Sequence, residues 1–250
     1  MPPRDALALL VLSMSAPSDP PASFHVLPAG VEVRFSAAWS AWPRRVERIA
    51  LDGEDAGRSR CLTSLPPGTR TFRDHPEGWG SHLYRFAGPG SLDLVLLRLP
   101  GEGLVGLPFD LPRLGDLMAA LGPRTTVQDG NTGTRLSPEM AVPAGTVLHL
   151  RGGDPSTVSL LGTPPRRWEI HVPAGQLWKF TVPPMMPPLT VGAFRAMGAV
   201  RADVSRIFAD GNNRQLRDDQ RLEPGRVYAV RAERPLTIRF RCPSAGRSLP

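Results

Sequence analysis

Short apolar stretches and turn residues alternate along residues 17–90. The clearest alternation covers residues 31–35, 46–51 and 82–86, where apolar and polar groups fall on opposite faces, as in half-buried antiparallel strands. No convincing helical period occurs in this region. The pattern predicts a β-sandwich over residues 1–90.

The pattern changes at the turn over residues 88–91. Apolar runs over residues 92–99 and 104–111 predict two strands separated by a Pro-Gly turn. Four apolar residues then recur at helical spacing and define one buried helix face, which Gly122 and Pro123 end. These residues are Leu114, Leu117, Met118 and Leu121. A hairpin followed by a helix that crosses the sheet is therefore expected.

A second run repeats this order. Residues 168–172 and 177–182 predict two strands, and Val191, Phe194 and Met197 predict a helix face. Beyond the helices the runs align at an offset of 80: Leu136 with Leu216, Val142 with Leu222, Gly145 with Gly225, and Val147 with Val227. Repetition of this kind indicates homologous units. We expect units over residues 91–153 and 166–241, a linker over 154–165 and a flexible tail over 242–250, with Leu117, Leu121, Phe194 and Met197 buried.

Parts of both units resemble ubiquitin. The second unit contains Arg206-Ile207-Phe208-Ala209-Asp210-Gly211, then Leu216, Asp218 and Asp219, which is similar to the middle of ubiquitin. The first unit ends in Leu148-His149-Leu150-Arg151-Gly152-Gly153, which is similar to ubiquitin's end. The resemblance implies tandem β-grasp domains, each with a short helix on a mixed sheet.

The region before the units has a resemblance of its own. Residues 65–85 resemble the later strands of a fibronectin type III or immunoglobulin-like domain, with Tyr84 as the corner tyrosine. The expected fold class is mainly β with α+β units, in which an N-terminal β-sandwich precedes two ubiquitin-like β-grasp domains. This arrangement is similar to the multi-domain ubiquitin-like proteins of bacterial ubiquitination-like operons.

The resemblance implies two functional features. Ile207, Tyr228 and Val230 would form the apolar patch that partner proteins contact; the alternative is that Ile207 and Val230 are ordinary strand residues covered by a neighbouring domain. A conjugation tail would end at Gly246 after removal of residues 247–250. The internal Gly152 and Gly153 are a processing scar, a relic or a plain turn.

The expected function is that of a modifier or self-assembling scaffold in a bacterial ubiquitination-like pathway. The alternative is a non-conjugated protein-binding adaptor. Expected partners are other proteins, including activating and conjugating enzymes and an isopeptidase, together with further copies of the chain. No arrangement of nucleophile and base predicts an enzyme.

Composition narrows the partners further. The chain carries a net charge of +7, but its basic residues are dispersed and only Lys179 is a lysine, so neither a nucleic-acid platform nor lysine-linked chains are expected. No run is long enough for a membrane span. The apolar segment over residues 6–16 predicts a first strand, with a signal peptide as the alternative. A cytoplasmic location is therefore expected.

Two Asp-Gly-Asn turns suggest calcium as a bound metal. Calcium prefers several carboxylate and amide oxygens on a bent loop, although a simple turn explains the same residues. The candidate ligands are Asp129, Asn131, Asp210, Asn212, Asp218 and Asp219. No other cofactor is expected.

Overall fold

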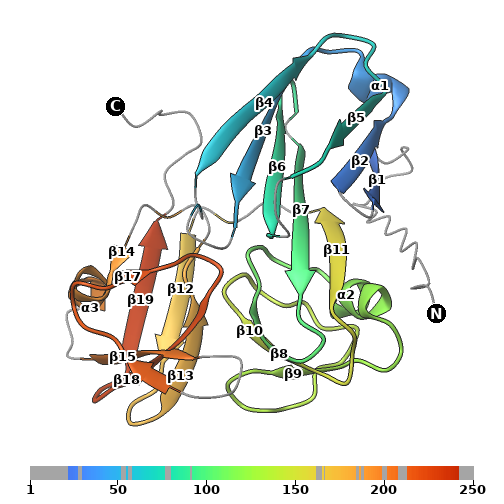
Figure 1. Ribbon diagram of the computed structural model, residues 1–250. Coiled ribbons are helices and arrows are strands. Elements are labelled where there is room, and N and C mark those ends of the chain that lie inside the picture. The colour runs from blue at the N-terminus through green and yellow to red at the C-terminus, as the bar shows by residue number, and fades with distance from the viewer. Residues whose placement is uncertain are drawn as a thin grey trace.

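The computed structural model shows a mainly β protein with several antiparallel sheets (Figure 1), which confirms the expected β-rich class. It describes residues 22–27, 30–51, 55, 58–76, 80–90, 92–161, 165, 167–183, 186, 189–198, 202–207 and 213–241. Within these ranges the helices are α1 (Ala37–Ser40), α2 (Leu114–Leu121) and α3 (Val191–Gly198).

Two sheets face each other in the N-terminal part. One has the order β1-β2-β5, with β1 (Ala22–Leu27), β2 (Gly30–Phe35) and β5 (Thr71–Asp74). The other has the order β11-β7-β6-β3-β4, with β3 (Arg44–Ala50), β4 (Ser59–Leu65), β6 (His82–Ala87), β7 (Leu92–Leu99) and β11 (Ser156–Leu161). Apolar side chains from both sheets, such as Val33 and Phe86, form a common core.

Strand β7 belongs to two cores. Leu92, Leu94 and Leu96 join the core of the N-terminal sheets, whereas Val95, Leu97 and Leu99 join a second core on the opposite face. This explains the nearly unbroken apolar run, because a strand covered on both faces has no solvent side.

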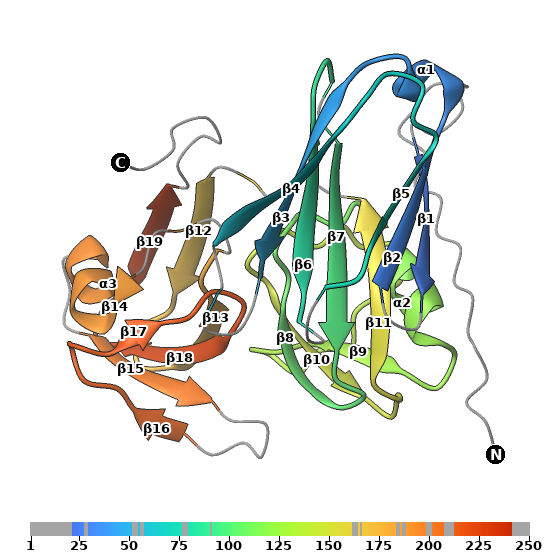
Figure 2. The same ribbon diagram turned by 45° about the horizontal axis from the view of Figure 1, so that its top comes forward.

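The neighbours of β7 correct two expected boundaries. β6 pairs with one edge of β7 and β11 with the other (Figure 2). The proposed boundary at residues 90 and 91 thus lies between two paired strands. Residues 154–165, expected as a linker, contain β11.

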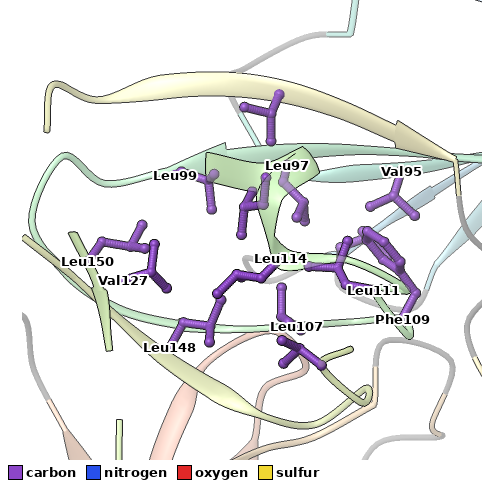
Figure 3. Close-up of a cluster of buried hydrophobic side chains, with 14 of the residues drawn as sticks. Val95, Leu97, Leu99, Leu107, Phe109, Leu111, Leu114, Val127, Leu148 and Leu150 are labelled. Atoms are coloured by element: carbon purple, nitrogen blue, oxygen red, sulfur yellow. The ribbon is translucent and has the colours of Figure 1, made fainter. Parts of the chain in front are cut away.

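The second core lies between the five-stranded sheet and a three-stranded one. The latter has the order β8-β10-β9, with β8 (Gly103–Gly106), β9 (Thr126–Asp129) and β10 (Val147–Arg151). Figure 3 shows Leu97 and Leu99 of β7 on one side of α2's Leu114, with Leu148 and Leu150 of β10 on the other.

The C-terminal part has its own core. Its strands are β12 (Arg167–Val172), β13 (Leu177–Thr181), β14 (Leu189–Thr190), β15 (Ala202–Ile207), β16 (Asn213–Gln215), β17 (Arg221–Leu222), β18 (Val227–Ala232) and β19 (Leu236–Arg241). The rings of Phe194 from α3 and Phe180 from β13 stack in this core, with centroids 4.7 Å apart.

The buried helix faces follow the sequence pattern in part. Leu117 and Phe194 are buried as predicted. Leu121 is half-buried and packs against its core. The prediction for Met197 is wrong, because its side chain is 37% exposed.

Strand pairing follows the same scheme in the two units that the sequence pattern predicts as a repeat. β7 pairs with β11 as β12 pairs with β19, and β10 lies between β8 and β9 as β18 lies between β13 and β15. Backbone hydrogen bonds repeat as well: the N–H of Leu114 donates to the carbonyl of Met140, and that of Val191 to the carbonyl of Gln220. We therefore call residues 92–161 the first repeat and residues 167–241 the second repeat.

The pairing differs from the mixed sheet that the ubiquitin resemblance implies. Every ladder between named strands in the described ranges is antiparallel, and the parallel contact there is one isolated bridge between Ala174 and Ala232. The observed and the implied sheets differ in which strand pairs with the central strand. β10 and β18 pair antiparallel with β8 and β13, while the opening strands β7 and β12 pair with the closing strands β11 and β19.

The two repeats meet through equivalent strands. β8 contacts β18, and β13 contacts β10. Gly106 and Thr181 hold the same position, opposite Val147 and Val227 respectively, and a Cβ on Gly106 would lie only 2.5 Å from that of Thr181. Contact between equivalent residues marks a two-fold interface. The repeats are arranged like the subunits of a symmetric dimer.

Candidate protein-binding site

The predicted apolar patch is wrong for two of its three residues. Tyr228 and Val230 are 1% and 0% exposed, and both lie in the core of the second repeat. Their strand β18 is central, between β13 and β15. The backbone N–H of Glu223 donates to the Tyr228 hydroxyl at 2.6 Å, so this polar atom is also engaged inside the fold. Ile207 ends β15, and its side chain lies outside the described part.

The internal diglycine is a structured turn. Gly152 has a positive φ of 78°, and the N–H of Gly153 donates to the carbonyl of Gly101 at 3.2 Å. The chain then continues directly into β11. Within the fold this pair therefore connects two strands and is no free tail. Gly246 lies outside the described residues.

The first Asp-Gly-Asn turn contacts the second repeat. Asp129 Oδ1 accepts the backbone N–H groups of Asn131 and Thr132 at 2.8 and 2.7 Å, which is the local geometry of an Asx turn. The Asn131 side chain bonds both backbone groups of Lys179 on β13, and Lys179 Nζ donates to the Gly130 carbonyl. The only lysine therefore holds the two repeats together.

The remaining calcium candidates do not converge in the described ranges. Asp218 pairs with Arg195, and Asp219 lies 3.5 Å from Arg217. Asp210 and Asn212 lie outside those ranges. No group of three or more His, Cys, Asp or Glu side chains comes together there.

A polar clamp joins the two N-terminal sheets. Asp74 of β5 accepts from Arg48 of β3 at 2.6 Å and from the hydroxyl of Tyr84 of β6 at 2.8 Å. Burial, and then the hydrogen bond with Asp74, raises the pKa of Tyr84. The tyrosine expected at a corner thus keeps its proton and bonds a carboxylate in the opposite sheet.

One end of these sheets is built around tryptophans. We call residues 36–44 the tryptophan corner. The N–H of Trp39 donates to the side chain of Ser36, which caps α1. Arg44 lies 3.6 Å from the centroid of the Trp39 ring and donates to the carbonyls of Trp39 and Gly90. These bonds fix the corner against the turn that leads into β7.

Trp42 is the exposed member of this corner. Its side chain is 56% exposed, whereas Trp168 is 2% exposed. The sequence pattern does not single out Trp42, because tryptophan more often fills a core than a binding surface. The informative neighbour is Pro43: a proline has no backbone N–H to donate, so it occurs at the edge or the start of a strand and not in its interior.

Comparisons with known proteins add no family. No protein-family model and no curated protein sequence matches the chain. No helix in the described ranges is long and apolar enough to cross a membrane.

Proposed function

We propose that this chain is a non-conjugated protein-binding adaptor, in which a β-sandwich and two repeats form one scaffold. The observation that carries the proposal is Trp42. A large apolar side chain that is 56% exposed on a fixed corner is a feature of binding surfaces, where tryptophan is enriched among the residues that dominate affinity.

The corner is suited to binding because its framework is already ordered. Arg44 is 5% exposed and is held by three contacts, to the Trp39 ring, the Trp39 carbonyl and the Gly90 carbonyl. A rigid support lowers the entropic cost of immobilising Trp42 against a partner. The scaffold supports the same role, since β7 connects the sandwich and the first repeat through two cores.

The test is site-specific photo-crosslinking in the native cells. A photoreactive phenylalanine analogue replaces Trp42 in one full-length variant and Met140 in another. Met140 is a matched control because it is 45% exposed and lies in the first repeat. We expect protein adducts from position 42 that compete with the unlabelled chain, and none at this level from position 140. Equal adducts at both positions would overturn the adaptor proposal.

A ubiquitin-like modifier is the second candidate. One observation favours it: β15, which ends at Ile207, pairs with both β16 and β18, as expected for the strand and turn that resemble ubiquitin. In this case the chain would be processed to Gly246 and joined to a target amine. Intact mass of the protein from native cells separates the candidates, because a chain that ends at Gly246 or carries a covalent adduct favours the modifier.

A further inference from the structure

The two repeats differ at one strand edge. In the first repeat β7 pairs with β11 on one side and β6 on the other. In the second repeat the equivalent strand β12 pairs with β19, and its other edge has no ladder among the described residues. A strand edge without a partner presents backbone donors and acceptors that another strand can bind.

The equivalence of β7 and β12 extends to side chains. Val95, Leu97 and Leu99 face the core of the first repeat. Trp168, Ile170 and Val172 face the core of the second. The last residue of each triplet pairs with the first residue of the closing strand, Ser156 or Leu236. β6 on β7 is therefore a template for a strand on β12.

The outward face of β12 and β19 carries positive charge. Arg167 and Arg241 are cross-strand partners, both are exposed, and neither forms an ion pair within the described ranges. Like charges directly opposite on a sheet repel each other. The next outward pair, Glu169 and Arg239, is already an ion pair at 2.9 Å. A carboxylate beside Arg167 would thus relieve repulsion at one end of the sheet.

We propose that β12 binds an extended segment of a partner protein by antiparallel strand addition, with an acidic side chain beside Arg167 and Arg241. The proposal rests on the adaptor function but uses a surface separate from Trp42. The segment alternates apolar and acidic residues. In the template, Leu83 lies opposite Val95 and is buried in the core, so an apolar residue belongs opposite Trp168.

The template also shows that a charge pair between strands fits such an edge. Arg85 of β6 lies opposite Asp93 of β7, and two hydrogen bonds of 2.9 Å join them. Asp93 shares the face of β7 that carries Val95, whereas Arg167 lies on the outward face of β12, so the proposed pair uses the other face of the sheet and has the charges reversed. The arginines are on the receiving sheet, and the carboxylate comes from the incoming segment.

The experiment titrates the full-length chain into a fluorescein-labelled peptide of alternating Leu and Glu, with fluorescence anisotropy as the readout. We expect saturable binding. Replacing both arginines, Arg167→Glu with Arg241→Glu, should weaken binding about tenfold, since attraction becomes repulsion. This variant keeps a like-charge pair and so keeps the sheet comparable. The matched control carries Arg214→Glu and Arg217→Glu, two exposed residues outside β12 and β19, and should bind within about twofold of the original chain.

Two further peptides test the strand geometry. A peptide with Lys in place of Glu should not bind. A peptide with N-methyl groups on alternate backbone amides should lose binding, because it cannot complete a ladder. Undiminished binding of the N-methylated peptide, or equal loss in both arginine variants, would overturn strand addition.

Light scattering of the chain alone tests whether a second copy of the chain occupies the edge of β12. A dimer that dissociates on the Arg167 and Arg241 replacements would assign this edge to a second copy and overturn the partner proposal. These outcomes do not involve Trp42. A failed titration with intact adducts at position 42 would therefore reject the acidic segment and leave the adaptor function standing.

Discussion

The two repeats have the same strand pairing but different surroundings, and the contrast lies in β7 and β12. The outward residues of β7 are Leu92, Leu94 and Leu96, which lie in the core between the two N-terminal sheets. Those of β12 are Arg167, Glu169 and His171, all exposed. One pairing scheme therefore serves a strand inside a sheet and a strand at its edge. The side chains on one face determine which role each copy takes.

The largest expected effect concerns the equivalent core residues Leu117 and Phe194. Leu117→Ala should cost about 2–5 kcal/mol and Phe194→Ala about 3–5 kcal/mol of unfolding free energy, because each leaves a cavity in a closed core. Because β7 is shared between the core of the N-terminal sheets and the core of the first repeat, Leu117→Ala should also increase hydrogen exchange in β6. Phe194→Ala should not. Denaturant unfolding with amide exchange by mass spectrometry measures both. Equal exchange of β6 in the two variants would contradict the shared-strand account.

The next effect compares an ion pair at β7 with an ion pair at β12. Arg85→Ala leaves the Asp93 carboxylate, whose side chain is 4% exposed, without its partner, and should cost about 3 kcal/mol. Arg239→Ala breaks the exposed pair with Glu169 and should cost less than about 1 kcal/mol. Urea unfolding of both variants measures the two costs, and similar values would show that the Asp93 carboxylate is not sealed from solvent.

A smaller effect tests the two-fold contact between the repeats. Gly106→Ala should cost about 1–3 kcal/mol, since its methyl group would meet Thr181. Adding Thr181→Gly should recover much of this loss, as expected for residues that meet each other. A double-mutant cycle by thermal unfolding provides the measurement. Additive costs would mean that these positions do not meet.

The smallest effect is a pH dependence in one repeat only. Burial, and then the charges of Arg151 and Lys179, lowers the pKa of His149 below its ordinary value of 6.5. The unfolded chain therefore takes up this proton at higher pH than the folded chain. Stability should decrease as the pH falls from above 6.5 through the folded-state pKa. His149→Gln should reduce this slope in unfolding experiments at several pH values. The equivalent residue in the second repeat is Ala229, which does not titrate.

The sequence was most informative where periodicity reports burial. The offset of 80 residues predicted the repeat, and helical spacing predicted burial of Leu117 and Phe194. The apolar run in β7 indicated that both faces of the strand are covered. Periodicity shows which face is buried, but not which element covers it. The pairing of β7 with β6 and β11 was therefore out of reach.

The candidate site was harder to predict, because resemblance assigns a role without testing exposure. Val227-Tyr228-Ala229-Val230 is apolar throughout, which is typical of a central strand and contradicts a patch at Tyr228 and Val230. Trp42 was missed because its residue type suggests burial, whereas its side chain is exposed. Tryptophan is usually placed in cores, and only the following proline separates this residue from a strand.

The sole lysine has a consequence for experiments. Lys179 is the only side-chain amine in the chain, and its Nζ bonds the Gly130 carbonyl across the junction of the repeats. An amine-reactive reagent must compete with this bond before it can acylate the side chain. The acylation rate at Lys179 therefore reports how often the contact between the two repeats opens. Mass spectrometry measures this rate at one residue and without any engineered label.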